Sequence, residues 1–175
     1  RTSGGPPLVV ACPTEAVWGL SCDPDNVEAV AELLALKDRP VSKGLILVAH
    51  DMAQLDFLLS GLSGEQLKTL SDTWPGPATW LVPHGGRVPS WISGEHATVA
   101  VRVSDHPVVR ALCLAWGGPL VSTSANPWGA RPATAAFQVR RYFGDALDEI
   151  VPGELGGSGR PTTIRDLASG RVIRG

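Results

Sequence analysis

The sequence is poor in cysteine and has no long apolar runs. Its three cysteines, Cys12, Cys22 and Cys113, are odd in number and show no C-x-x-C spacing. This argues against a disulfide framework and a zinc site, and it indicates a reducing compartment. No apolar run approaches the roughly 18 residues of a membrane-spanning helix, and no signal-peptide pattern is present. We therefore expect a cytoplasmic protein without a membrane partner.

The common catalytic and metal-binding motifs are also absent. The sequence has no G-x-x-x-x-G-K-[ST] phosphate loop, no G-x-G-x-x-G after the first predicted strand and no G-x-S-x-G elbow. The four histidines are scattered without ligand spacing, so we predict no metal site built from protein side chains. A Cys–His hydrolase that uses Cys12 or Cys113 remains a minor alternative on chemical grounds.

The composition is that of one globular domain with an uneven charge distribution. The 175 residues are 43% hydrophobic and 18% charged, and a domain of this length buries roughly 70% of its unfolded surface. Residues 1–100 hold 6 Lys/Arg against 11 Asp/Glu, whereas residues 101–175 hold 9 against 6, and all nine cations are arginine. Arginine suits phosphate and carboxylate recognition because its planar fork donates two parallel hydrogen bonds.

Apolar runs and helical spacings predict a mixed sheet with helices packed on it. Strands are predicted at 8–12, 44–49, 78–82, 98–103, 149–151, 163–166 and 171–174, with one more that leads into Ser122, and helices at 25–36, 52–59, 64–70, 107–116 and 134–143. The run at 44–49 does not alternate, which is typical of a central strand covered on both faces. The strands outnumber the crossover helices, so a clean doubly wound fold is disfavoured. The chain starts at Arg1 and the first strand follows soon after, so we expect a natural N-terminal segment before it.

Polar residues at the predicted helix starts supply the expected caps. Asp25 with Glu28 three residues later is typical of a capping box. Asp105 and Thr134 stand before two later helices and are expected to cap them. The segment 84–96 is rich in Gly, Pro and polar residues and is predicted to be a surface excursion.

Two places in the sequence indicate a ligand site. In Pro119–Gly129 a short apolar strand runs into small hydroxyl residues, then an Asn-Pro step and a glycine, which predicts a strand that ends in a tight polar loop. In open α/β sheets, ligands bind outside the carboxyl ends of strands. Arg102 is the one charge in its predicted strand, so it needs a partner, either an anionic ligand or an internal carboxylate.

Six motifs, in order and at matching spacings, resemble the YrdC-like family. They are Pro13–Leu20, Lys37–Pro40, Lys43–Leu45, Trp74–Thr79, Ala100–Val103 and Ser122–Asn126. The resemblance is closest to the bacterial single-domain members and extends over nearly the whole chain. It implies one YrdC-like domain over residues 1–175, an α/β fold whose open, twisted, mixed sheet carries packed helices and a concave, positively charged groove.

The resemblance also implies an activity. The expected enzyme is a nucleotidyltransferase that joins L-threonine, bicarbonate and ATP into threonylcarbamoyl-AMP and releases pyrophosphate, with Mg²⁺ accompanying the ATP. The product would serve the t6A modification of adenosine 37 in tRNA, with tRNA and the downstream proteins TsaB, TsaD and TsaE as expected partners. Such chemistry requires positioned cations rather than a protein nucleophile, in keeping with the missing catalytic motifs.

Motif matching implies the residues of the site. The family's K-x-R and S-x-N tetrad falls on Lys37, Arg39, Ser124 and Asn126, which are the expected catalytic residues. The residues expected to bind threonine are Thr14, Arg102 and Ser124. The residues expected to bind ATP are Arg39, Lys43, Thr79, Ser122, Asn126, Thr134 and Arg174. Among all of these, Thr14, Ser124 and Asn126 are expected to supply short, directional hydrogen-bond donors.

Two other interpretations remain open at this point. The first is a non-catalytic module that binds tRNA or double-stranded RNA by shape and phosphate, which the arginine-weighted second part favours and the pI of about 6.1 disfavours. The second is a carbamoyl-transfer domain of the hydrogenase-maturation type, which shares the implied fold. Fold alone does not separate these functions, so the site has to.

Overall fold

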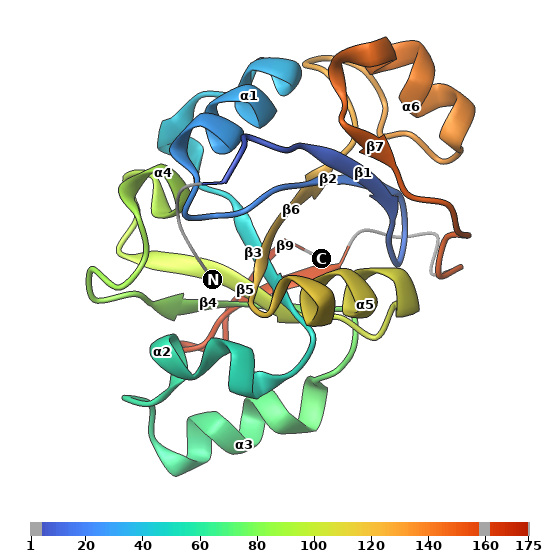
Figure 1. Cartoon of the computed structure of the whole chain (residues 1–175). Helices are drawn as coiled ribbons and strands as arrows, with labels where there is room; N and C mark the ends of the chain where they lie inside the picture. Colours follow the sequence, from blue (N-terminus) through green and yellow to red (C-terminus); the bar gives the residue numbers. More distant parts are fainter. Residues whose placement is uncertain (1–4, 158–161, 175) are drawn as a thin grey trace.

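The computed structural model describes residues 5–157 and 162–174, which form one open sheet with helices on both faces (Figure 1). The strands are β1 Val10–Pro13, β2 Trp18–Ser21, β3 Ile46–Ala49, β4 Ala78–Pro83, β5 Thr98–Val103, β6 Leu120–Ser124, β7 Glu149–Ile150, β8 Thr163–Asp166 and β9 Val172–Arg174. The helices are α1 Val27–Lys37, α2 Asp56–Leu59, α3 Gly64–Thr73, α4 Ser90–Ser93, α5 Pro107–Trp116 and α6 Ala136–Phe143. Short 3₁₀ turns are η1 Val41–Lys43, η2 Met52–Leu55 and η3 Gly144–Ala146.

The sheet is mixed, as the sequence predicts. Its strand order is β7-β1-β2-β6-β3-β5-β4-β8-β9. The pairs β1/β7, β3/β5 and β4/β8 are parallel, and the other neighbours are antiparallel. β3 lies in the middle of this order, between β6 and β5, so the prediction of a central strand at 44–49 is confirmed. This arrangement brings the ends of β3, β5 and β6 close to the β1–β2 connection.

β3 is covered on both faces of the sheet. Successive side chains of a strand point in opposite directions, and those of β3 pack into a different hydrophobic cluster on each face. Leu47 belongs to the main hydrophobic core, whereas Val48 packs with Val109 and Cys113 of α5 in a second, smaller cluster. In Figure 1, α5 crosses the near face of the sheet, while α1 and α6 lie at the top and α2 and α3 at the bottom.

The cysteines are buried free thiols. Burial raises the pKa of Cys12 to about 11 and that of Cys113 to about 12. A thiol with such a pKa stays protonated near neutral pH and is a poor nucleophile. The alternative of a Cys–His hydrolase on either residue therefore finds no support in the structure.

The predicted helix caps are wrong, although the helices are present. Asn26, not Asp25, caps α1, because its Oδ1 accepts a hydrogen bond from the backbone N–H of Ala29 at 3.1 Å. The side chain of His106 rather than Asp105 caps α5. α6 begins at Ala136 with no side-chain cap, because the hydroxyl of Thr134 donates to Gln138 Oε1 instead. At α1 and at α5, two neighbouring polar residues could cap the helix, and the folded chain uses only one of them.

Two further segments differ from the sequence-based expectation. β2 is a strand that the sequence patterns did not predict, because it has only four residues and one of them is glycine. It pairs with β1 as a short hairpin. The segment 84–96 is not entirely a surface excursion, since it contains α4, whose Ile92 is fully buried. The backbone N–H of Leu45 donates to the carbonyl of Ile92 at 2.8 Å, so α4 supports the start of β3.

We expect Gly94→Ala to destabilise the protein, because Gly94 ends α4 where it touches the η1 segment. Gly94 has a φ of +62°, and a Cβ there would collide with the carbonyl oxygen of Ser42. The free energy of unfolding, measured in urea, should fall by at least about 2 kcal/mol. Gly64→Ala is the matched control, since a Cβ on Gly64 has no neighbour within 4 Å. Equal stability of the two variants would contradict the close approach of Gly94 to the carbonyl oxygen of Ser42.

Candidate functional site

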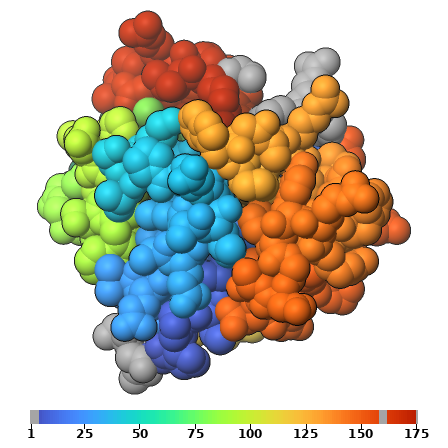
Figure 2. Space-filling model, turned by 90° about the horizontal axis from the view of Figure 1, so that it is seen from above, coloured from blue at the N-terminus to red at the C-terminus, as the bar shows by residue number. Residues whose placement is uncertain are grey.

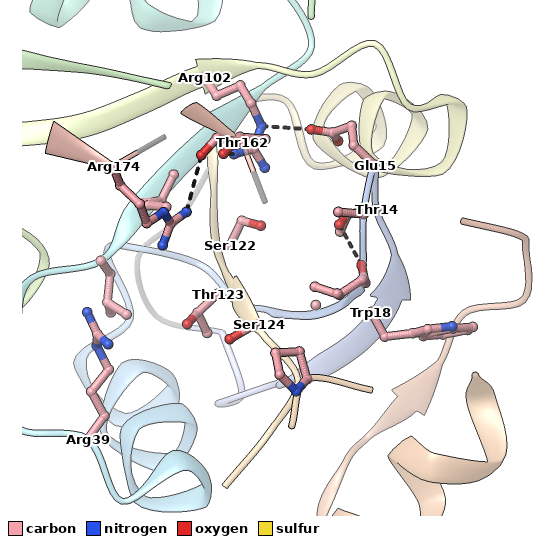
Figure 3. Close-up of a pocket in the computed structure, with 16 residues that line it drawn as sticks. Thr14, Glu15, Trp18, Arg39, Arg102, Ser122, Thr123, Ser124, Thr162 and Arg174 are labelled. Atoms are coloured by element: carbon pink, nitrogen blue, oxygen red, sulfur yellow. Dashed lines mark hydrogen bonds and ion pairs between the residues drawn. The ribbon is translucent and has the colours of Figure 1, made fainter. Parts of the chain in front are cut away.

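A pocket of about 240 Å³ lies where the β1–β2 connection, the end of α1 and strands β3, β5, β6 and β9 converge (Figure 3). Its lining residues are Thr14, Glu15, Ala16, Val17, Trp18, Gly19, Arg39, Leu45, Ile46, Arg102, Ser122, Thr123, Ser124, Pro132, Thr162 and Arg174. Three of these are arginines and one is a carboxylate, so the formal charge of the lining is +3 − 1 = +2. Such a lining favours an anionic ligand.

A second pocket of about 260 Å³ adjoins the first. The two share Arg39, Leu45, Ile46 and Arg174. The second adds the cation Lys43 and an apolar floor of Leu81, Val99, Ala100, Ile164 and Ile173. Arg39 and Arg174 therefore stand at the junction of the two spaces.

Lys37 ties the end of α1 to the loop after β6. Its side chain is 6% exposed, and its Nζ donates to the carbonyl oxygens of Ser124 at 2.6 Å and Asn126 at 3.2 Å. Ser124 Oγ at 3.4 Å and Asn126 Oδ1 at 3.2 Å complete the set of acceptors. Three members of the predicted tetrad thus meet at one ammonium group.

The side chains of Lys37 and Arg39 point in different directions because α1 ends between these two residues. Asp38 adopts a left-handed conformation with a φ of 51°, and the N–H of Arg39 donates to the carbonyl of Leu34. This C-cap turns the chain, so Lys37 points inward while Arg39 extends to the pocket wall. Arg39 Nη2 donates to the carbonyl of Gly44 at 3.0 Å. Burial, followed by the charge of Arg174, lowers the pKa of Arg39.

The polar groups expected to act as donors instead donate within the protein. Thr14 Oγ1 donates to the carbonyl of Val17 at 2.6 Å, and Ser124 Oγ donates to Asn126 Oδ1 at 2.6 Å. Asn126 Nδ2 donates to the carbonyl of Ala130 at 3.0 Å. In this arrangement these residues fix the loops around the pocket, and the charged donors of the lining are its arginines.

Arg102 has the internal carboxylate that its place in a strand requires. Its Nε lies 2.9 Å from Glu15 Oε2, and its Nη1 donates to Thr79 Oγ1 at 3.0 Å and Thr162 Oγ1 at 3.2 Å. Burial lowers the pKa of Arg102, while the charge of Glu15 acts in the opposite direction. Of the two partners considered from the sequence, the carboxylate is present, and the guanidinium still lines the pocket.

The remaining predicted residues divide into three groups. Ser122 and Arg174 line the main pocket, and Lys43 lines the second, with its Nζ 5.2 Å from the centroid of the Trp128 ring. Thr79 is fully buried and acts on Arg102 rather than lining either pocket. Thr134 is exposed and lines neither pocket.

The face that carries the η1 segment and the loop after β6 is shown in Figure 2. The cyan segment that follows α1 and the amber loop that follows β6 adjoin on this face, with the orange α6 beside them. The contact between Lys43 and Trp128 joins these two segments. Lys43, which lines the second pocket, thus contacts a residue that is more than 80 positions away in the sequence.

Two residues of the lining, Glu15 and Thr162, were not predicted from sequence patterns. Glu15 could have been found, because it lies in the Thr14 motif and the charge of Arg102 requires a carboxylate partner. Thr162 has no such signal, since only the pairing of β8 with β4 brings it beside Thr79. Within residues 5–157 and 162–174, no group of three or more His, Cys, Asp or Glu side chains could hold a metal ion. No helix in this part of the chain is long and apolar enough to cross a bilayer.

The fold and the cation-lined pocket define a single α/β architecture of the YrdC-like type. The chain belongs to the Sua5/YciO/YrdC family, whose model, described as "Telomere recombination", matches residues 7–175. It is 58% identical to the threonylcarbamoyl-AMP synthase of Stutzerimonas stutzeri over 166 aligned residues. The alignment covers 95% of this chain and 89% of that protein. The threonylcarbamoyl-AMP synthase of Saccharophagus degradans is 57% identical over 166 residues, covering 95% of this chain and 87% of its own.

Solved structures agree with this assignment. P. abyssi Sua5 complexed with L-threonine superposes with a TM-score of 0.85 at 31% identity, over 93% of this chain and 48% of that one. This chain thus spans about half of that structure. E. coli YciO superposes with a TM-score of 0.82 over 95% of this chain and 82% of its own, and its 24% identity shows the fold alone. The expected YrdC-like fold is confirmed.

We expect the contribution of Lys37 to stability to depend on pH. Burial, followed by the charge of Arg39, lowers the pKa of Lys37 from the ordinary 10.5 to about 8. Between these values the unfolded chain binds a proton that the folded chain does not. The contribution of Lys37 to the free energy of unfolding should therefore be lowest below pH 8 and rise towards pH 10.5, by at most about 3 kcal/mol.

The measurement is urea unfolding of the wild type and Lys37→Met at pH 7 and pH 10. The buried thiols also titrate in alkali, but they are the same in both proteins, so their effect cancels in the difference. An equal difference in stability at the two pH values would show that the Lys37 ammonium is not held as described.

Proposed function

We propose that this chain is a threonylcarbamoyl-AMP synthase, a nucleotidyltransferase that converts L-threonine, bicarbonate and ATP to threonylcarbamoyl-AMP and pyrophosphate. One observation carries the proposal: the first and second pockets adjoin and share Arg39 and Arg174. The first, called the inner pocket from here on, also contains the buried, oriented Arg102. A reaction that joins an amino acid to a nucleotide needs two such neighbouring spaces. The names of the curated relatives support the same activity.

In this proposal the inner pocket binds threonine. Arg102 binds the carboxylate of the amino acid, and Thr14 and Ser124 shape the space beside it. Because both hydroxyls already donate to internal acceptors, their lone pairs suit the N–H groups of the amine or carbamate. The bound L-threonine of P. abyssi Sua5 supports this choice of substrate.

The second pocket binds ATP in this proposal. Its apolar floor suits a nucleoside, and Arg39, Lys43 and Arg174 suit the phosphates. Burial and, after it, the charge of Arg174 lower the pKa of Arg39, and the second cause means that the two guanidinium groups oppose each other electrostatically. An anion between them relieves that repulsion, which favours phosphate at the junction of the pockets.

The residues act by position and charge. The amine of threonine attacks the carbon of bicarbonate to give a carbamate, with one bicarbonate oxygen leaving as water. A carbamate oxygen then attacks the α-phosphate of ATP as pyrophosphate leaves. The cations at the junction stabilise the charge that develops on the phosphate oxygens. Lys37, through Ser124 and Asn126, fixes the loop that borders the reacting groups. The walls of the pocket limit the access of water to the labile carbamate.

Magnesium enters this proposal as part of the Mg–ATP substrate. The one carboxylate among the described lining residues, Glu15, is bonded to Arg102 and Ser104. The lining therefore does not match a dedicated magnesium site, and the phosphates would hold the ion.

The wider role follows from the same activity. We propose that the product serves t6A modification of tRNA in the cytoplasm, with TsaB, TsaD and TsaE downstream and direct tRNA binding as a further property. We also propose that residues 1–175 form one YrdC-like domain. The RNA-binding module and the hydrogenase-maturation type have less support, because the curated relatives at 55–58% identity are named as the synthase.

Incubation with L-threonine, Mg–ATP and carbon-13 bicarbonate tests the proposal. We expect pyrophosphate release and a labelled threonylcarbamoyl-AMP peak in mass spectrometry, each requiring all three substrates. Omission of each substrate in turn is the control. Folded protein that gives neither product would refute the synthase, and steep salt dependence of RNA binding in its place would favour the RNA module.

Arg39→Ala should reduce kcat/KM by at least about 30-fold, because loss of one charged donor to the transition state costs at least about 2 kcal/mol. The measurement is the initial rate of pyrophosphate release. Arg140→Ala is the matched control, since Arg140 is exposed on α6 and lines neither pocket. An Arg39→Ala enzyme with unchanged kcat/KM would remove Arg39 from the site.

A further inference from the structure

Glu15 is a buried carboxylate with a fixed geometry beside the proposed threonine site. It lies in the β1–β2 connection and is 5% exposed. Its Oε2 lies 2.9 Å from Arg102 Nε, and its Oε1 accepts a hydrogen bond from Ser104 Oγ at 2.7 Å. Ser104 is fully buried, and its backbone N–H donates to the carbonyl of Ala49 at the end of β3. The carboxylate is thus anchored to the centre of the sheet.

The backbone of Glu15 is held as firmly as its side chain. The N–H of Gly156 donates to the carbonyl of Thr14 at 2.9 Å. A Cβ on Gly156 would lie 2.9 Å from the Cα of Glu15, so the two segments are in close contact. Glu15 therefore has little freedom to move towards the pocket or away from it.

Arg102 is held by this carboxylate on one edge and by two hydroxyls on the other. Nε faces Glu15, and Nη1 donates to Thr79 and Thr162. A planar guanidinium fixed through two of its nitrogens cannot rotate, so the direction of the third, Nη2, is set as well. Figure 3 shows the guanidinium of Arg102 above Ser122, with Glu15 at its side. Arg102 lines the pocket in this orientation.

We propose that Glu15 is a positioning residue that sets the orientation of the Arg102 guanidinium and thereby the affinity for the carboxylate of threonine. This rests on the proposed function and adds a residue that acts through Arg102. Without the carboxylate, Arg102 would be a buried cation held by the hydroxyls of Thr79 and Thr162 alone, and its guanidinium would be fixed through one nitrogen instead of two. Glu15 lines the inner pocket but not the second one, so its effect should be confined to the amino acid.

Glu15→Gln tests the proposal, because the substitution keeps the shape and removes the charge. We expect the KM for threonine to rise at least tenfold, whereas the KM for ATP changes less than twofold. Calorimetric titration with threonine should show the same loss of affinity. Asp105→Asn is the matched control: it removes an exposed carboxylate whose charge also acts on Arg102 without an ion pair, and it should change the KM for threonine less than twofold.

A double-mutant cycle separates positioning from general structural support. In an Arg102→Ala background, Glu15→Gln should cause no further loss of threonine affinity, because the group through which it acts is gone. A loss that persists in that background, or equal rises of the KM for threonine and ATP, would overturn the proposal.

Ser104→Ala provides a milder variant should Glu15→Gln fail to fold. It removes the hydroxyl that holds Oε1 and leaves the ion pair in place, so the KM for threonine should rise about threefold and that for ATP should not change. An unchanged KM for threonine would count against the proposal. If the wild type binds no threonine, both the proposal and the synthase function fail; if it binds threonine and Glu15→Gln binds it equally well, only the role of Glu15 fails.

Discussion

The burial of the Lys37 ammonium is the constraint on which the rest of the site depends. A buried cation is tolerated only when hydrogen-bond acceptors surround it, and the four oxygens around Nζ all come from Ser124 and Asn126. These residues are 87 and 89 positions away in the sequence, so one ammonium joins the end of α1 to the end of β6. The C-cap at Asp38 then directs Arg39 to the pocket. Loss of this contact would release both the end of α1 and the loop after β6, which together hold this wall of the pocket in place.

A second buried cation, Arg102, is satisfied in a different way. Lys37 is surrounded by neutral oxygens that fix a loop, whereas Arg102 is paired with a carboxylate and two hydroxyls and still lines the pocket. Ion pairs of this kind often contribute little net stability, because desolvation offsets the attraction. Their value lies in orientation. The first cation thus fixes the loop that borders the pocket, and the second places an oriented guanidinium in the pocket lining.

Sequence patterns predicted the sheet, the central strand and six of the sixteen residues that line the first pocket, because these depend on apolar runs and short motifs. They failed where several neighbouring residues could serve equally: Asp25 and Asn26 can both cap α1, and only the folded chain selects Asn26. The partner of Arg102 remained undecided for the same reason, since charge alone does not say which carboxylate is near. Thr162 could not be predicted at all, because its place beside Thr79 depends on the pairing of β8 with β4. Local chemistry can be read from the sequence, whereas the choice among chemically equal partners is made by long-range packing.

The absence of standard catalytic motifs follows from the kind of reaction proposed. An activated serine or cysteine must be held near a base, and such pairs leave recognisable spacings in a sequence. A reaction between a carbamate and a phosphate anhydride brings its own nucleophile and its own leaving group. The protein has to bring two anions together against their repulsion, and cations held by the fold can do this without reorganising during the reaction. Arg39 and Arg174 at the junction of two pockets, with Arg102 fixed in the inner one, form such an arrangement from residues that lie on separate strands and loops.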